Sequence, residues 1–286
     1  MNTKIVSRLR HSLTISNLLK WLVAILWFVV TIYPLWWMFS VVFTPAGVPV
    51  AINPRLYPTS LTDGIAHIKE VIFGSEFLRS YLVSFAYSGL QIGGMLLVCS
   101  MAAYEFSLHN FPGKNILFFI CLSALMVPGV VTLIPTYRIV AKLGWLDTIW
   151  GLAVPGIASA FALFLFRQFM ENIPRELLDA AQIDGASHFG VFWYVVRPLS
   201  SNAYTTMGVL GFMFAWGNFL WPLVISRKAA MYTISLAVTH YIGPQTWYPI
   251  EITLTAAFLA ALPPIIVYIV LQRYLVEGIA LTGLKG

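Results

Sequence analysis

Six apolar runs, each long enough to cross a lipid bilayer, dominate this chain. They lie at Leu18–Phe43, Ser80–Tyr104, Ile116–Tyr137, Thr148–Met170, Ala203–Ile225 and Thr253–Leu271. A helix of about 20 residues spans the hydrocarbon core, and a backbone inside lipid must satisfy its own hydrogen bonds. The runs lack the alternating pattern of a spanning barrel strand. The sequence therefore predicts an all-α integral membrane protein, a bundle of six transmembrane helices.

The composition supports this class and gives no sign of a separate soluble domain. Hydrophobic residues make up 59% of the chain and charged residues 10%, unlike a soluble globular protein. The connections between the runs are too short for a core of their own, so residues 1–286 are predicted to form a single domain. The longest connection contains Leu61–Phe73, which has the pattern of a short amphipathic helix lying against the membrane.

The distribution of positive charge predicts the orientation. The net charge is +6, and a basic cluster precedes or enters the first apolar run at Lys4, Arg8, Arg10 and Lys20. The positive-inside rule places this N-terminus in the cytoplasm, and six crossings return the C-terminus to the same side. Because no basic face is interleaved with aromatic residues, anionic lipid is the predicted partner of this charge and nucleic acid is not.

The interiors of the runs contain no Asp, Glu, Lys or Arg, which argues against an ion-driven carrier and against an enzyme. Milder polarity remains at Gln91, Ser123, Thr132 and Asn218, which suits a neutral, hydrogen-bonding solute or helix packing. The two cysteines and five histidines are not spaced as metal ligands. No GxxxxGK[ST] loop is present to hold nucleotide phosphates, so any ATPase must be a separate protein.

A polar, acidic, helix-prone loop, Ile173–Pro198, separates the fourth and fifth runs and should lie in the cytoplasm. Pro174 suits the first turn of a helix, and Glu176 and Asp179 place negative charge near the positive end of the helix dipole. This loop is therefore a candidate docking surface for a partner outside the membrane.

The side chains in the second half of this candidate helix are small, so they leave a flat surface. Ala180, Ala181 and Gly185 offer a low-relief surface, and Ala181 and Gly185, four residues apart, are expected to share one helical face. Farther along, an apolar stripe at Phe189, Phe192, Trp193 and Val196 is expected to lie on the ends of the spans, and Pro198 to end that helix. An interfacial hairpin without a partner is the alternative interpretation.

The fifth run carries the candidates for a solute pathway. Trp216, Phe219 and Trp221 offer aromatic rings, and Asn218 offers a hydrogen-bonding amide. For each residue taken singly, however, helix packing or the interfacial aromatic belt is the favoured interpretation. Proline and glycine between Met126 and Pro135 are expected to bend the third run, either to open space or as a packing kink.

Several short sequence motifs together resemble those of the MalG-like permease subunits of carbohydrate-uptake ABC importers. The loop matches their spacing through Asp179-Ala180-Ala181, Gly185, Val195 and Arg197-Pro198, and further matches are Phe111-Pro112-Gly113-Lys114, Met126-Val127-Pro128, Leu143-Gly144-Trp145 and the segment Trp216–Leu223. Asp179 stands where the family has glutamate, Arg197 where it has leucine, and Gly217-Asn218 where it has an acidic residue.

The resemblance implies a six-helix type I importer bundle in a prokaryotic inner or plasma membrane. It implies three kinds of partner: a second homologous permease, a dimer of ATPase subunits that bind ATP and Mg, and an extracytoplasmic solute-binding protein. Residues Glu176, Asp179, Ala180, Ala181 and Gly185 would dock on the ATPase, and the chain itself would have no catalytic residue or cofactor. The implied solute is a carbohydrate. A polyol or glycerol-phosphate permease, and more distantly a secondary carrier, are the alternatives.

Overall fold

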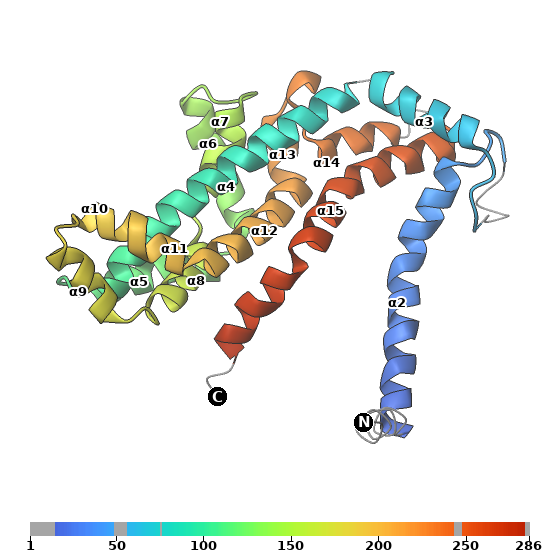
Figure 1. Ribbon diagram of the computed structural model, residues 1–286. Coiled ribbons are helices and arrows are strands. Elements are labelled where there is room, and N and C mark those ends of the chain that lie inside the picture. The colour runs from blue at the N-terminus through green and yellow to red at the C-terminus, as the bar shows by residue number, and fades with distance from the viewer. Residues whose placement is uncertain (1–14, 49–55, 75, 243–247, 284–286) are drawn as a thin grey trace. The chain divides into compact units, whose positions relative to one another are not determined.

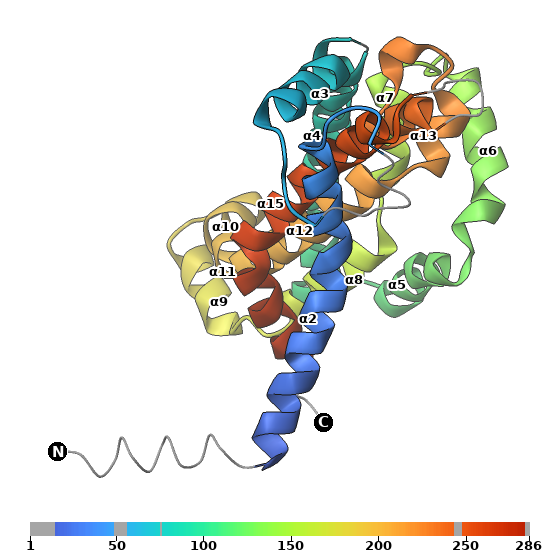
Figure 2. The same ribbon diagram turned by 90° about the vertical axis from the view of Figure 1, so that its right-hand side faces the viewer.

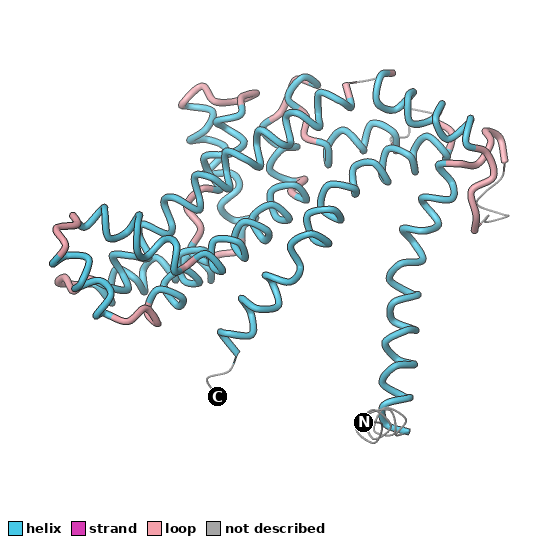
Figure 3. The backbone as a smooth tube through the Cα atoms, in the orientation of Figure 1, coloured by secondary structure: helices cyan, strands magenta, loops and turns pink. Residues whose placement is uncertain are grey.

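The computed structural model describes residues 15–48, 56–74, 76–242 and 248–283, which form helices joined by short loops (Figures 1 and 3). No strand occurs in these ranges, so the all-α prediction is confirmed. The chain divides into two compact units, a small unit of Met1–Gly74 with Tyr241–Leu259 and a large unit of Ser75–His240 with Ala260–Gly286. Each unit is described by itself. Whether they behave as one domain stays a prediction.

The small unit contains three helical segments. They are α2 (Ile15–Val42), α3 (Leu61–Phe73) and the first turns of α15 (Ile250–Gly283). The predicted helix at Leu61–Phe73 is confirmed, and the Ser60 hydroxyl caps it by accepting from the Asp63 N–H at 3.3 Å. The buried His67 ring meets the Val42 carbonyl oxygen at 2.9 Å, which fixes α3 to the end of α2.

The large unit is built around α4 (Phe77–Leu108), the long helix labelled α4 in Figure 1. The other α-helices are α5 (Lys114–Ser123), α6 (Gly129–Lys142), α7 (Ile149–Ala153), α8 (Ala160–Met170), α9 (Arg175–Ile183), α10 (His188–Val191), α11 (Arg197–Leu199), α12 (Ser201–Gly217), α13 (Leu220–Ile225), α14 (Ile234–Ala237) and the remainder of α15 from Ala260 onward. Short 3₁₀ or π segments are η1 (Ala124–Met126), η2 (Val154–Gly156), η3 (Phe192–Val196), η4 (Ala229–Met231) and η5 (Val238–Tyr241).

Two of the predicted spans are bent where proline and glycine interrupt them. The axes of the segments on either side of Val127-Pro128 differ by 103°, and Figure 2 shows α5 turning sharply into α6. Val127 adopts an extended conformation because the residue before proline avoids the helical region. The second bend, 49°, follows Pro155-Gly156 between η2 and α8. The predicted bend of the third run is confirmed, and the fourth run, predicted as one helix, is two.

Three described helices are continuous, apolar and long enough to cross a membrane, or five spans if each bent pair counts as one. The continuous helices are Asn17–Val42, Phe77–Leu108 and Ile250–Gln272. The remaining predicted run, Ala203–Ile225, is divided between α12 and α13, and the 17 residues of α12 are at the short end of what spans a bilayer. Each of the six predicted runs therefore has a helical counterpart.

The core of the large unit forms where α8 and α12 pack on α4. Met95, Cys99 and Ala103 of α4 are buried against Phe166 of α8 and Met207 of α12. At two positions, glycine allows α4 to approach the neighbouring segments closely. A Cβ on Gly94 would lie 2.6 Å from an Ile157 methyl group, and a Cβ on Gly211 would lie 2.8 Å from the Met95 methyl group. This packing fixes α4 against α8 and α12.

Candidate functional site

The predicted docking loop begins with α9. Pro174 occupies the position before the first helical residue, and Glu176 lies in the first turn, near the positive end of the dipole. Leu178 is 7% exposed and anchors α9 on the core, whereas Glu176, Asp179 and Ala180 are exposed. Nearly all of this helix is therefore open to a partner, with its apolar contact limited to one face.

Gly185 ends α9 and does not share its surface, which corrects the expectation that it lies on one helical face with Ala181. The helix stops at Ile183, and Gly185 has a positive φ of 86°. The Gly185 N–H donates to the Gln182 carbonyl and the Ala186 N–H donates to the Ala181 carbonyl, both at 3.0 Å. This is the Schellman arrangement, in which glycine is favoured for its left-handed backbone. Ala181 is half-buried against the core.

The predicted apolar stripe is also only partly correct. Phe192 and Val196 are buried as expected, but Phe189 and Trp193 are exposed and stack on each other at 6.0 Å. Residues Phe192–Val196 form a π-helix, in which the Arg197 N–H donates to the Phe192 carbonyl. The wider turn shifts the buried face by about one residue relative to a 3.6-residue repeat.

Pro198 does not end this helix. Residues Arg197–Leu199 continue it, because the wider turn precedes the position where proline lacks its N–H. Arg197 stands over the Trp193 ring at 4.6 Å and over the Tyr204 ring at 5.9 Å. The cation that departs from the family pattern is therefore packed on aromatic rings at the end of the loop.

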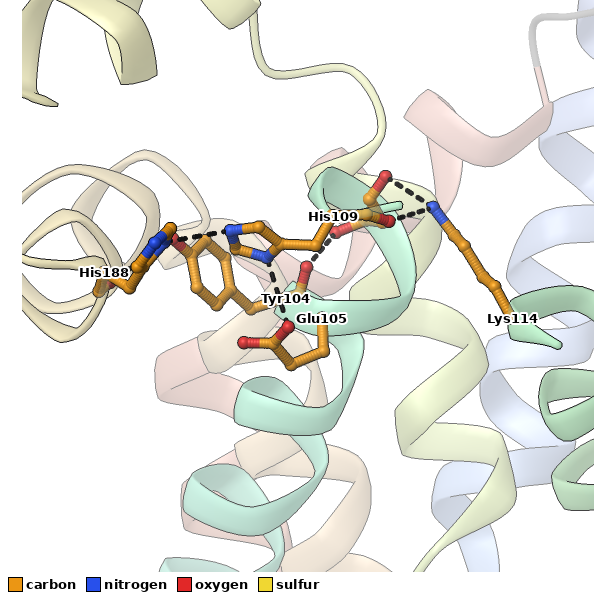
Figure 4. A network of polar contacts seen from close by, with 6 residues as sticks. Tyr104, Glu105, His109, Lys114 and His188 are labelled. Atoms are coloured by element: carbon orange, nitrogen blue, oxygen red, sulfur yellow. Dashed lines mark hydrogen bonds and ion pairs between the residues drawn. The ribbon is translucent and has the colours of Figure 1, made fainter. Parts of the chain in front are cut away.

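A polar junction ties this loop to the end of α4 (Figure 4). The Tyr104 hydroxyl donates to the His188 carbonyl at 3.3 Å, and the His109 Nε2 and His188 Nδ1 atoms are also 3.3 Å apart. The other His109 nitrogen lies 3.2 Å from a Glu105 carboxylate oxygen. Lys114, at the start of α5, donates to the His109 carbonyl at 2.8 Å. These contacts would therefore transmit a displacement of α10 to both α4 and α5.

A cavity of about 430 Å³ opens in the large unit between α4, α6, the α7–η2 segment and α13. Its polar lining side chains are Tyr87, Gln91, Thr132, Thr136, Asn218 and Trp221. The volume is within the range of small-molecule sites. Three of the four polar residues that the sequence singled out inside the spans, Gln91, Thr132 and Asn218, meet in this cavity.

Two of the predicted pathway residues form part of its wall. The Asn218 amide nitrogen donates to the Tyr87 hydroxyl at 3.3 Å, and its oxygen accepts from the Trp221 N–H at the start of α13. The Trp221 indole N–H donates to the carbonyls of Gly151 and Leu152 at 3.1 and 3.2 Å. Both side chains are thus held in place by the protein, and Trp221 can offer only its ring.

The other two predicted residues lie elsewhere. Trp216 is 4% exposed, donates to the Ala260 carbonyl at 3.0 Å and packs against Phe85 with ring centroids 4.8 Å apart. It does not line this cavity, and its place in the solute pathway stays a prediction. Phe219 is 39% exposed and lines a neighbouring hollow of about 500 Å³ that shares Gln91 and Asn218 with the cavity.

Sequence reasoning missed Tyr87 and Thr136. Tyr87 looked like an ordinary aromatic residue of a span, and its ring is 1% exposed. Only its partner, Asn218, 131 positions away, reveals its place at the wall. Within the described ranges, no three His, Cys, Asp or Glu side chains gather in a way that could hold a metal ion, and Cys99 and Cys121 are free thiols.

Comparisons with known proteins agree on one family. The arabinooligosaccharides transport system permease protein AraQ of Bacillus subtilis is 34% identical over 67% of this chain and 68% of that protein. The sn-glycerol-3-phosphate transport system permease protein UgpE of Brucella melitensis is 32% identical over 94% of this chain and 97% of that protein.

The fold has a counterpart in the crystal structure of a bacterial ABC transporter involved in the import of the acidic polysaccharide alginate. One of its chains superposes with a TM-score of 0.81, at 22% identity, over 91% of this chain and 96% of that chain. Residues 94–280 match the family model described as the inner membrane component of binding-protein-dependent transport systems. The protein is thus a membrane permease with the type I ABC importer fold, and it belongs to the family of binding-protein-dependent transport system inner membrane components.

Proposed function

We propose that this chain pairs with a second permease to form the pathway of an ATP-driven carbohydrate importer, fed by an extracytoplasmic solute-binding protein. The solutes named for its relatives are arabinooligosaccharides and sn-glycerol 3-phosphate, both small and hydroxylated. ATP and Mg belong to separate ATPase subunits, because the sequence has no phosphate-binding loop.

The exposed helix α9 is the observation that carries the coupling role. Only Leu178 among its residues is buried, so the acidic and alanine-bearing surface of Glu176, Asp179 and Ala180 is free for an ATPase groove. The following helix, α10, is joined through His188 to Tyr104 on α4. Movement of the ATPases would therefore reach α4, the helix that supplies Tyr87 and Gln91 to the cavity wall. ATP can drive this change only by binding one transporter state more tightly than the other.

The bilayer is the proposed partner of the apolar surface of α2. Its side chains are exposed around the helix, for example Trp21 at 67% and Trp27 at 72%. Lipid tails would cover such a surface without any specific contact. We place both termini and α9 in the cytoplasm of a prokaryotic cell, following the basic cluster at the start of the sequence.

A bulky side chain at Ala180 tests the docking surface. In a complex of all subunits in lipid, Ala180→Trp is expected to lower solute-stimulated ATP hydrolysis at least tenfold, because the indole would hold the groove away from α9. Ala180→Ser keeps the small size at the same exposed site and should retain most of the stimulation. Equal activity of both variants, with assembly verified by co-purification, would remove α9 as the docking element.

A further inference from the structure

We propose that the cavity between α4, α6, η2 and α13 is a solute site of this subunit, and that it selects neutral polyhydroxylated solutes against anionic ones such as glycerol phosphate or uronates. The proposal rests on the importer function above and assigns its substrate class. The lining side chains that carry it are Tyr87, Gln91, Thr136, Asn218 and Trp221.

Three interruptions of the helices converge on this cavity. Gly129 follows the break at Pro128, Gly156 belongs to the break before α8, and Asn218 lies between α12 and α13. All three breaks contribute residues to the lining. Irregular backbone at membrane depth occurs where it is buried in protein or lines a polar cavity, and broken helices mark solute sites in other transporters. The convergence indicates a site that is built into the fold.

The cavity presents uncharged hydrogen-bonding groups that the protein leaves available. For Gln91 and Thr136, no side-chain hydrogen bond is found among the described residues. Tyr87 is buried and accepts from Asn218, so it orients the Asn218 amide at the cavity wall. An amide and a hydroxyl each provide hydrogen-bond donors as well as acceptors. This combination suits a sugar, because every sugar hydroxyl can both donate and accept a hydrogen bond.

The absence of a side chain at Gly156 leaves room for the Gln91 amide at the cavity wall. A Cβ built on Gly156 would lie 2.5 Å from the Gln91 amide carbon and 2.6 Å from its nitrogen and oxygen. The amide therefore occupies the space that a side chain at 156 would fill. Gly156 is thus a positioning residue for Gln91. Beside it, the ring of Trp221 provides an apolar face, because its N–H is already bonded to the backbone.

The charge of the lining decides the class of solute. The cavity is lined by thirteen residues, and none of them is Asp, Glu, Lys, Arg or His. Arg227, whose guanidinium donates to the Tyr137 hydroxyl, is not among them. The start of α6 contributes roughly half a positive charge, too little to replace the water around a phosphate. A neutral solute loses less hydration on entry and can form hydrogen bonds with the uncharged polar side chains of the lining.

Protection of a single introduced thiol tests the site directly. Thr136→Cys, in a chain whose own cysteines are replaced by serine, would be assembled with its partner subunits in lipid and labelled with a small maleimide. Neutral di- and trisaccharides, including arabinose oligomers, would be compared with sn-glycerol 3-phosphate and galacturonate oligomers. At least one neutral probe is expected to protect the thiol introduced at position 136 at tenfold lower concentration than any anionic probe. Gln91→Leu should remove that protection. Lys142→Cys, at the end of α6 and outside the lining, is the unprotected control.

The outcomes separate the two proposals. Equal or better protection by the anionic probes would overturn the assigned class. No protection by any neutral probe, with solute-stimulated ATP hydrolysis intact, would overturn the site and leave the importer function standing. Absence of stimulated hydrolysis in the unmodified complex with every probe would instead refute the proposed function, and the site with it. If Thr136→Cys fails to assemble, Leu220→Cys on the α13 side of the lining replaces it.

Discussion

At the scale of single residues, Gly185 acts through its backbone. No atom lies within 4 Å of a Cβ built there, but its φ of 86° is strained for other residues. Gly185→Val is therefore expected to cost about 1–2 kcal/mol of loop stability and to lower solute-stimulated ATP hydrolysis several-fold. Gly185→Asn should cost less, because asparagine tolerates this conformation. Thermal unfolding of the complex and ATPase rates would measure both.

The comparison of these two variants separates a strained turn from a crowded groove. If the partner's groove demanded a bare backbone, asparagine and valine at position 185 would impair coupling equally. Equal loss in both variants would contradict the backbone explanation and restore the docking role that the sequence suggested.

Gln91 and Gly156 should behave as one unit. Gly156→Ala would displace the Gln91 amide, so it is expected to reduce uptake about as much as Gln91→Ala does, on the order of tenfold for lost solute contacts. In the Gln91→Ala background the space is empty, and Gly156→Ala should have little further effect. Uptake into proteoliposomes, measured for all four chains, gives the coupling. Additive losses would show that Gly156 acts independently of Gln91.

At the scale of elements, the junction between α4 and α10 is expected to transmit motion. Tyr104→Phe removes the hydrogen bond to the His188 carbonyl, a loss of about 0.5–1.5 kcal/mol. We expect the solute imported per ATP hydrolysed to fall about two- to tenfold, with docking retained. Tyr194→Phe is the matched control, because Tyr194 is 79% exposed and has no hydrogen bond within the described segments. A similar loss in both variants would exclude a specific role for the junction.

The bends show what local sequence predicts about an element and what it does not. Val127-Pro128 predicts an interruption because a residue before proline leaves the helical region. The π-helix at Phe192–Val196 has no comparable signal. Trp193 is exposed and Val191 is buried, an arrangement that the apolar residues of this stretch allow as readily as the predicted one.

At the scale of the whole molecule, orientation in the membrane is the prediction to check. Figures 1 and 2 place α9 and the loop after α6 at different ends of the large unit. In a chain with its own cysteines replaced, Gln182→Cys should react with an impermeant maleimide only from the cytoplasmic side, and Lys142→Cys only from outside. Labelling of intact cells and inverted vesicles distinguishes them. The reverse pattern would overturn the assigned topology.

The sequence by itself determined the membrane class, the helical fold, the acidic loop and the polar positions inside the spans. These depend on hydropathy, charge and spacing, which are local. Only the tertiary structure decided that Trp216 is packed away while Trp221 lines the cavity, that Tyr87 meets Asn218, and that Gly185 ends α9. The physical reason is that a membrane helix is apolar on all sides, so its sequence does not reveal which face meets a neighbour, lipid or a cavity.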